Sequence, residues 1–388
     1  MTNKNYPIIM SVLLSFSALS STFAAACPTG GGPSPGQVLQ CGQVVTSNVT
    51  LGADLICPNV TGFALKVIGS GIVFNGNGHQ IVAPQAAAGL YVQGAQIQVQ
   101  NIRVNGVPGD GIFAYDSPAL QVSNSNFSNN QIGILLYAEN TTMSNVSVVG
   151  NQASGNSLFG IRSGWDTNGA IESPVIRRND FSNSGSYAMY IQAQDYEVSG
   201  FDCNSLTNSL NGYYLKSGNF YIHDVQMSSQ RIQEAQFFID SALYVKVSNI
   251  DVSTALAPQP SQQHIGFDLY RVANFDINGL SSWNNDIGIK LETTGGVSPQ
   301  GTIENCSFYT NAVAAVMVTS YDGTPYGAVE LTNSVAQEVA PAIDLLVSPG
   351  TVLGAGSQFN FASGGNGGRQ RGDDSDGDSS SRCNRSRG

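Results

Sequence analysis

The sequence contains a short phrase, glycine followed by an aliphatic or aromatic residue, that returns at intervals in the twenties. Gly111-Ile112 opens one copy, Gly133-Ile134 opens the next 22 residues later, and Gly160-Ile161 follows. Further copies begin at Gly266-Phe267 and Gly288-Ile289. A period of this size is typical of a solenoid, in which each repeat is one coil that packs only on its neighbours. The repeat therefore predicts an elongated array rather than a single globular core.

Looser copies of the phrase complete the series. They begin at residues 89, 188, 212, 236 and 314, and with starts at 63 and 341 the spacings run from 22 to 30 residues. Short apolar runs between Gly and Asn turns indicate strands, so each coil should carry three short parallel strands. Excess residues should leave as loops, the longest at 255–264. We predict an all-β fold, a single-stranded parallel β-helix of about twelve coils spanning residues 63–362.

Two residue columns should hold the coils together. Because side chains alternate along a strand, the apolar residue after each glycine should point inward and stack on its equivalents; these are Ile112, Ile134, Ile161, Phe267 and Ile289. Asn130, Asn285 and Asn311 each stand three residues before the next coil start. We expect them to line a tight turn and to hydrogen-bond one another from coil to coil, as scaffold rather than as ligands.

The two ends of the chain differ from the repeat. Residues 1–26 read as a secretory signal with an apolar core and a small-residue cleavage site. Cleavage before Cys27 would also allow a lipid anchor, which Ala24 disfavours because an aliphatic residue usually stands there. Residues 27–62 read as a linker and N-terminal cap. Residues 363–388 read as a solvated, disordered Gly/Asp/Ser/Arg tail, with calcium binding by its Asp residues as the alternative.

The charge and the hydropathy of the chain argue against two kinds of partner, nucleic acid and the membrane interior. The net charge of -11 and the sequence pI near 4.6 argue against nucleic acid, which requires clustered Lys and Arg. No second apolar run is long enough to span a bilayer. We therefore expect a secreted or extracytoplasmic monomer with no transmembrane span.

Export makes disulfides available to the six cysteines. Cys41 and Cys57 flank a short segment and are the expected pair, a cross-link that contributes roughly 3 kcal/mol in the chain-entropy model. Cys203 and Cys306 lie four coils apart, about 19 Å at a strand spacing of about 4.8 Å, which exceeds the reach of a disulfide of about 7 Å. We interpret both as buried free thiols. The pairing of the two terminal cysteines, Cys27 and Cys383, stays open.

One stretch resembles a known superfamily. The opening reads Cys41-Gly42, then Leu55-Ile56-Cys57-Pro58, then Asn75-Gly76-Asn77-Gly78-His79-Gln80-Ile81, and the coils follow. This pattern resembles secreted right-handed parallel β-helix proteins of the pectate-lyase-like superfamily (parallel β-helix repeat family), over roughly residues 41–361. The resemblance implies a right-handed helix. It implies no single function, because the superfamily includes lyases, hydrolases, epimerases, tailspikes, adhesins and non-enzymes.

Catalytic motifs of related enzymes are missing. Polygalacturonases of this fold carry Arg-Ile-Lys, where this chain has Arg231-Ile232-Gln233, and Gly-His-Gly, where it has Gly78-His79-Gln80. The Asp-Pro-His of mannuronate epimerases is absent. The three His residues have no metal-ligand spacing. We therefore expect no metal or cofactor, except calcium if the chain is a lyase.

Outward positions carry the candidate binding residues. If the residue after each glycine points inward, the third and fifth residues of each coil point outward. These residues form a stripe along the length of the solenoid, and Trp165 lies just beyond it. Aromatic faces can stack on sugar rings, and neighbouring polar groups can bind hydroxyls. The alternative is that Tyr and Phe are ordinary strand residues that stack as a ladder on an exposed sheet. The candidate binding residues are Tyr91, Tyr115, Tyr137, Arg162, Trp165, Tyr190, Tyr214, Lys216 and Tyr270.

The second half of the stripe is charged. Its residues are Asp240, Asp268, Arg271, Lys290 and Glu292. Two carboxylates and a base on neighbouring coils suit acid–base work on a glycosidic or uronic linkage, although outward charge pairs are more often solvated salt bridges. Our first hypothesis is an exported protein that binds an extended polysaccharide or another surface glycan. The alternatives are a polysaccharide lyase or glycoside hydrolase that uses the charged residues, and a non-catalytic adhesive or structural rod.

Overall fold

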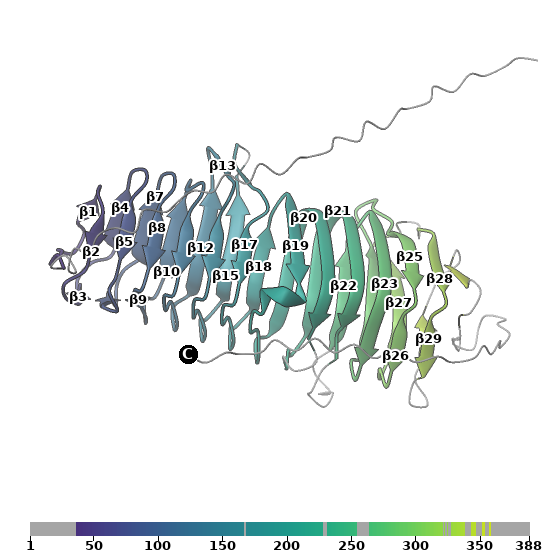
Figure 1. The fold of residues 1–388 in the computed structure, drawn as a ribbon. Coiled ribbons are helices and arrows are strands. Elements are labelled where there is room, and N and C mark those ends of the chain that lie inside the picture. The colour runs from purple at the N-terminus through teal and green to yellow at the C-terminus, as the bar shows by residue number, and fades with distance from the viewer. Residues whose placement is uncertain are drawn as a thin grey trace, which may run out of the picture. The chain divides into compact units, whose positions relative to one another are not determined.

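The computed structural model describes residues 36–337 except 167, 228–230, 254–263, 321, 323 and 325–326, and then residues 343–346, 351–353 and 357. These residues form an all-β parallel solenoid of about 11 turns (Figure 1). The predicted fold class is thereby confirmed, with about one coil fewer than expected. The signal of residues 1–26, the tail of residues 363–388, Cys27, Cys383 and most of the 255–264 loop lie outside the described residues.

The first strand of each coil builds one continuous face of the solenoid. Strands β1 and β4 begin this face, and neighbours pair in parallel throughout. In chain order the strands are β1 (Val44–Val45), β4 (Phe63–Ile68), β7 (Ala88–Gln93), β10 (Asp110–Tyr115), β12 (Ile132–Ala138), β15 (Phe159–Trp165), β18 (Tyr187–Gln192), β20 (Asn211–Gln226), β21 (Ala235–Asp251), β22 (Ile265–Tyr270), β24 (Ile287–Thr293), β27 (Ala314–Ser320) and β30 (Ile343–Leu346).

Shorter strands complete the early coils. A six-stranded sheet contains β2 (Val49–Thr50), β5 (Val73–Asn75), β8 (Gln98–Gln100), β11 (Gln121–Ser123), β14 (Ser147–Val149) and β17 (Val175–Arg177). Two small sheets contain β3 (Leu55–Ile56), β6 (Gln80–Val82) and β9 (Arg103–Val104), and β13 (Thr142–Met143) with β16 (Ala170–Ile171).

Later coils are built differently, because β20 and β21 are 16 and 17 residues long and pass through two faces. A bulge at Gly218/Asn219 marks their bend. The remaining elements are β19 (Asp195–Ser199), the 3-10 helix η1 (Gly200–Asp202), β23 (Asn274–Trp283), β25 (Gln300–Glu304), β26 (Ser307–Tyr309), β28 (Val329–Thr332), β29 (Val335–Gln337) and β31 (Thr351–Leu353).

The predicted inward column is present. Ile112 pairs with Ile134, which pairs with Ile161, and farther along Phe267 pairs with Ile289. All five side chains are fully buried. Between them the column continues through Tyr213 and Phe237. One coil cannot bury such a residue alone, so each coil is stabilised by its neighbours.

The structure explains why the repeated phrase begins with glycine. A Cβ on Gly111 would lie 2.6 Å from the Gly133 carbonyl oxygen and 2.7 Å from the Asn130 amide nitrogen. A Cβ on Gly133 would lie 2.6 Å from both the Gly160 carbonyl oxygen and the Asn156 amide nitrogen. Non-bonded carbon does not approach atoms this closely. Glycine is therefore required where the turn carrying the asparagines packs on the start of each coil.

Asparagine side chains run from coil to coil, as predicted. The backbone N–H of Asn130 donates to Asn156 Oδ1 at 2.8 Å, and that of Asn285 donates to Asn311 Oδ1 at 3.3 Å. A second ladder joins residues that were not predicted: Asn151 donates to Asn179, and Asn179 to Asn204. These ladders satisfy buried backbone groups at the turns, which supports the scaffold interpretation.

The cysteines match the prediction in part. Cys41 and Cys57 form a disulfide with their Cα atoms 5.5 Å apart, and Cys306 is a buried free thiol. The interpretation of Cys203 as a second buried thiol was wrong, because this residue is exposed and disulfide-bonded. It follows η1 on a left-handed turn (φ 50°) rather than sitting on an inward strand position, and strand periodicity does not apply there. A disulfide indicates an oxidising compartment.

Candidate functional site

The outward face of the first strands, from β7 to β24, carries the predicted stripe. Tyr91 lies on β7, Tyr115 on β10, Tyr137 on β12, Arg162 and Trp165 on β15, Tyr190 on β18, Tyr214 and Lys216 on β20, and Tyr270 on β22. Strand register places Tyr190, Tyr214 and Phe238 side by side in one row. Trp165 departs from the stripe, because it is half-buried and packs against the core.

The aromatic rings of this face stack mainly on one another. Tyr190 and Tyr214 have centroids 4.4 Å apart with ring planes 9° apart, and Tyr115 and Tyr137 stack at 6.4 Å. Phe238 continues the first series at 5.1 Å from Tyr214. Neighbouring rings therefore cover each other's faces. The face therefore offers ring edges rather than the open ring faces that the sequence analysis expected, and the hydroxyls of Tyr91, Tyr115 and Tyr214 donate to Gln93, Glu139 and Asp240.

A further outward row lies three residues before the first predicted outward column on each strand, and the sequence analysis missed it. It holds Phe63, Asp110, Phe159 and Tyr187, each immediately before the glycine position or its equivalent. Phe159 stacks on Tyr187 at 6.2 Å. Burial raises the pKa of Asp110 to about 7, although the charge of Arg162 opposes this. Simple alternation would have placed this row inside, because the glycine interrupts it: in β10 two consecutive buried residues, Gly111 and Ile112, separate the half-buried Asp110 and Phe113.

Asp240 anchors one side of the charged cluster, which we define as Asp240, Asp268, Arg271, Lys290 and Glu292. Its carboxylate accepts hydrogen bonds from Tyr214 at 2.6 Å and from the Arg271 guanidinium at 2.5 Å. Burial acts to raise the pKa of Asp240, but bonds from Ser241, Tyr214 and Arg271 outweigh it and lower the pKa. Arg271 is held in addition by the Tyr270 ring, 4.6 Å away.

Asp268 forms the other side of the charged cluster. The Lys290 ammonium lies 3.8 Å from Asp268 Oδ2 and also contacts Glu292. The second oxygen of Asp268, Oδ1, is buried without a hydrogen-bond partner. Burial raises the pKa of Asp268 to about 7, and the nearby Glu292 carboxylate adds to this while Lys290 opposes it. Asp268 therefore lies in a buried cluster that also contains a second carboxylate, Glu292, and one cation, Lys290.

The structure brings the predicted catalytic residues together on β21, β22 and β24. Asp240 pairs with Tyr270, two residues beyond Asp268 on the neighbouring strand. The Cα atoms of Asp240 and Asp268 are therefore separated by one strand spacing across the sheet and two residues along the strand, which is about 8 Å. Asp240, Asp268 and Glu292 are only 4%, 4% and 6% exposed. The cluster is thus compact, and little of it reaches solvent.

Two further findings concern the part of the chain that the structure describes. No group of three or more His, Cys, Asp or Glu side chains there is placed to hold a metal ion. No helix there has the length and apolar character needed to cross a membrane.

With this geometry established, the chain can be compared with known proteins. Residues 62–173 match the family model described as "Right handed beta helix region". The chain contains a right-handed β-helix. The matched stretch runs from β4 to the turn after β16, and the predicted resemblance to right-handed parallel β-helix proteins is confirmed. No curated protein matches the chain in sequence.

Solved structures share the fold at a distance. The catalytic unit of a thermostable α-1,3-glucanase from Streptomyces thermodiastaticus is 12% identical, with a TM-score of 0.35; the match covers 83% of this chain and 65% of that one. The A-module of a mannuronan C-5 epimerase from Azotobacter vinelandii is 10% identical, with a TM-score of 0.46 and coverage of 80% and 85%. An α-1,3-glucanase catalytic domain in complex with tetrasaccharides is 12% identical, with a TM-score of 0.31 and coverage of 86% and 71%. Similarity at this level concerns the fold alone.

Proposed function

We propose that this protein binds an extended polysaccharide lengthwise along the outward face. The observation that carries the proposal is the continuity of the face: half-buried tyrosines occupy outward positions, in two adjacent columns, on β7, β10, β12, β18, β20 and β22. Strands repeat about every 4.8 Å, so a polymer lying along the axis would meet an aromatic hydroxyl on most of these coils. Such an array suits a ligand that itself repeats.

The mode of contact follows from the stacking of the rings. Because the ring faces cover one another, sugar hydroxyls would meet phenol hydroxyls and ring edges. The charged side chains Arg162 and Lys216 stand among the tyrosines and add donors. Binding would therefore rest on many hydrogen bonds to a rigid row, each of which contributes only about 0.5–1.5 kcal/mol net. We expect affinity to grow with polymer length through the number of engaged coils.

A panel of neutral and acidic polysaccharides, tested by affinity electrophoresis with and without calcium, checks this proposal. We expect retardation on at least one polymer, and a several-fold weaker retardation for the double variant Tyr190→Ala/Tyr214→Ala. Tyr309→Ala is the matched control, because this tyrosine packs against Trp283 away from the outward face. Unchanged mobility on every polymer, or equal losses in both variants, would contradict the proposal and favour a structural rod.

Cleavage of the bound polymer is the second candidate function, and one observation favours it. Asp268 and Asp240 are neighbours whose environments move their pKa values in opposite directions, which is the arrangement of an acid and a base. Asp268 would protonate the leaving oxygen, and Asp240 would activate water. We rank this function second because both carboxylates are almost fully buried, which limits the access of a polymer to them.

The pH dependence of product formation tests the second candidate. A hydrolase would need Asp268 protonated and Asp240 ionised, so activity should fall as the pH rises through about 7, and the lowered pKa of Asp240 should keep the base ionised to more acidic pH than for an ordinary aspartate. Reducing ends measure hydrolysis, and absorbance near 235 nm measures an unsaturated lyase product. Asp268→Asn should abolish either signal, and Lys290→Ala should lower it. Activity that rises above pH 7 would exclude Asp268 as the acid.

A further inference from the structure

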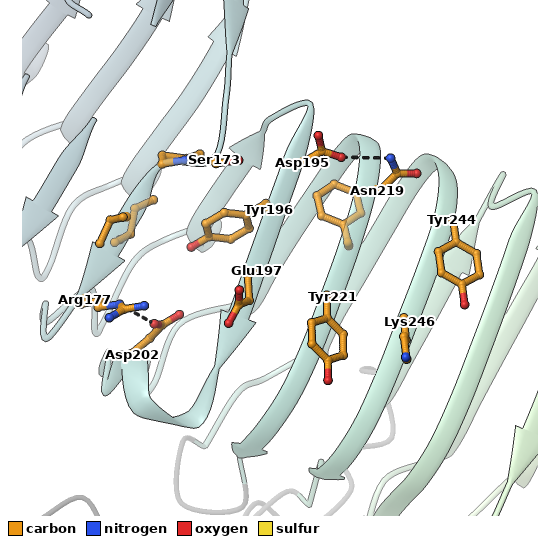
Figure 2. Close-up of a pocket in the computed structure, with 14 residues that line it drawn as sticks. Ser173, Arg177, Asp195, Tyr196, Glu197, Asp202, Asn219, Tyr221, Tyr244 and Lys246 are labelled. Atoms are coloured by element: carbon orange, nitrogen blue, oxygen red, sulfur yellow. Dashed lines mark hydrogen bonds and ion pairs between the residues drawn. The ribbon is translucent and has the colours of Figure 1, made fainter. Parts of the chain in front are cut away.

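A second candidate site lies on a different face of the solenoid, where the early and later coils meet. A pocket of about 460 Å³ opens between β17 and the strands β19, β20 and β21 (Figure 2). Strand β17 pairs with β14 but not with β19, so the strand ladder is interrupted there. Backbone hydrogen bonds flank the gap, from Ser173 to Asp195 and from Arg178 to Asp202. The pocket is therefore the space left where two coil shapes join.

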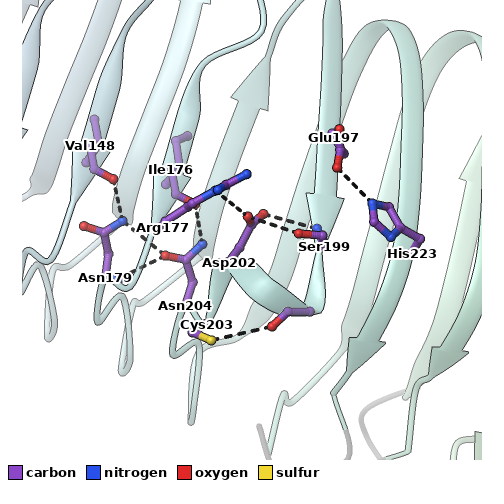
Figure 3. Close-up of polar contacts among 11 residues, drawn as sticks. Val148, Ile176, Arg177, Asn179, Glu197, Ser199, Asp202, Cys203, Asn204 and His223 are labelled. Carbon is purple, nitrogen blue, oxygen red and sulfur yellow. Dashed lines mark hydrogen bonds and ion pairs between the residues drawn. The ribbon is translucent and has the colours of Figure 1, made fainter. Parts of the chain in front are cut away.

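The wall at the β17 end is held rigidly by buried polar contacts. Asp202 is 5% exposed and accepts from the Arg177 guanidinium at 3.1 Å and from the Ser199 backbone N–H at 3.2 Å (Figure 3). Burial raises the pKa of Asp202, while the bonds from Ser199 and the Arg177 charge oppose it. Beneath this pair the Asn179–Asn204 rung continues the asparagine ladder. The wall is thus ordered before any ligand arrives.

The opposite wall is aromatic and cationic. Tyr221 and Tyr244 are 39% and 38% exposed, far more than the tyrosines of the core. The Lys246 ammonium lies 5.5 Å from the centre of the Tyr221 ring. Among the described residues Lys246 makes no ion pair, although Asp276 occupies the equivalent position on the neighbouring strand β23. An unpaired cation beside exposed rings is suited to an anionic ligand with a hydrophobic side.

Hydrogen-bonding groups lie between the two walls. The Glu197 carboxylate accepts from His223 at 2.9 Å and is still 61% exposed as a side chain. Asn219 donates to Asp195 at 3.0 Å, which fixes the direction of its amide. Burial lowers the pKa of His223, but its bonds to Asp224 and Glu197 outweigh this and raise it. These groups present oriented acceptors and an amide to the hydroxyls of a ligand.

We propose that this pocket binds a sugar ring that carries one anionic substituent, with the anion at Lys246. Ring hydroxyls would bond to Glu197 and Asn219, and the apolar face of the sugar would lie on Tyr244 or Tyr221. The volume falls within the usual range of about 300–1,000 Å³ for small-molecule sites. This site is separate from the outward face and does not depend on the function proposed for it.

A matched pair of ligands tests the proposal on the full chain. Methyl β-glucuronide and methyl β-glucoside differ only in the carboxylate, and NMR titration at low salt measures their millimolar affinities. We expect the glucuronide to bind about tenfold more tightly, since one charge-assisted hydrogen bond contributes about 1.5 kcal/mol. Lys246→Gln should remove this preference and leave glucoside binding unchanged. Equal affinity of the two ligands for the wild type, or a preference that survives Lys246→Gln, would overturn the proposal.

A second pair of variants separates the pocket from the outward face. Lys216→Gln removes a lysine of the same charge from the outward face, so it should leave the glucuronide preference intact. The double variant Tyr190→Ala/Tyr214→Ala should also leave it intact while weakening polysaccharide retardation. If Lys216→Gln abolished the preference instead, the acidic sugar would be bound on the outward face, and the pocket proposal would be wrong.

Discussion

The coils up to η1 and those from β20 to β22 are tied to their neighbours in different ways. In the early coils, asparagine ladders such as Asn151–Asn179–Asn204 tie each turn to the next. In the later coils, Tyr213, Phe237 and Phe267 stack in the interior with centroids 4.9 and 4.6 Å apart. Hydrogen-bonded ladders require turns of constant shape, whereas stacked rings fill the interior of coils with long strands. The difference shows that the same repeated sequence pattern can form coils of two shapes, one with short strands and one with long strands.

The largest expected effect is on the aromatic stack. Phe237→Ala removes a fully buried ring between two others and should lower the free energy of unfolding by about 3–5 kcal/mol through the cavity it leaves. Phe238→Ala is the matched control, because the next residue points outward and should cost about 1 kcal/mol. Urea denaturation measures both. Similar losses in the two variants would show that the inward stack has no special role.

A smaller loss is expected in the asparagine ladder. Asn151→Ala removes the acceptor of the Ser125 backbone N–H and the donor to the Val122 carbonyl, and both partners are buried. We expect a loss of about 2 kcal/mol, because buried groups left unsatisfied cost about 1–3 kcal/mol. Gln152→Ala, at an exposed neighbouring site, should change stability by less than about 0.5 kcal/mol. Hydrogen exchange should quicken in β11, β14 and β17 and not in β21 or β22; a uniform change would contradict local ladder support.

The smallest expected effect lies at the junction and has the opposite sign. Tyr196 on β19 is 4% exposed, and its hydroxyl is buried without a hydrogen-bond partner. Tyr196→Phe should therefore raise the free energy of unfolding by about 1 kcal/mol. Because the hydroxyl is covered, binding of methyl β-glucuronide should not change. A loss of stability would mean that the hydroxyl has a partner in solution, and the junction would then be better packed than the structure indicates.

The sequence predicted the fold well because the repeat and its physical cause are local. Glycine, an inward apolar residue and a turn asparagine recur together, and steric contact between Gly111, Gly133 and Asn130 requires that combination. The two outward columns that hold the candidate binding residues followed from simple alternation, which also placed Asp240 and Asp268 on neighbouring strands. The strand starts could therefore be assigned to within a residue or two.

Other features depended on contacts that alternation does not encode. Whether the rings of Tyr190 and Tyr214 face solvent or each other is decided by their rotamers, and the structure has them stacked. The pocket lies where β17 and β19 do not pair, next to η1, a three-residue departure from the repeat that is followed by the exposed Cys203. The residues that line it, such as Tyr221 and Lys246, lie on the second half of long strands that the sequence analysis treated as separate short ones. The irregular segments between repeats are the sequence feature that would have indicated the pocket.

The glycine contact at each coil start also makes the length of the solenoid a countable quantity. Asp110 and Ile132 occupy equivalent positions, each followed by a glycine packed against the next coil. Excising residues 111–132 would join Asp110 to Gly133 and keep a glycine at the coil start, and the axis would shorten by about 4.8 Å. We therefore expect the solenoid to tolerate the deletion or duplication of a whole coil. Removing part of a coil would displace the glycine from the coil start.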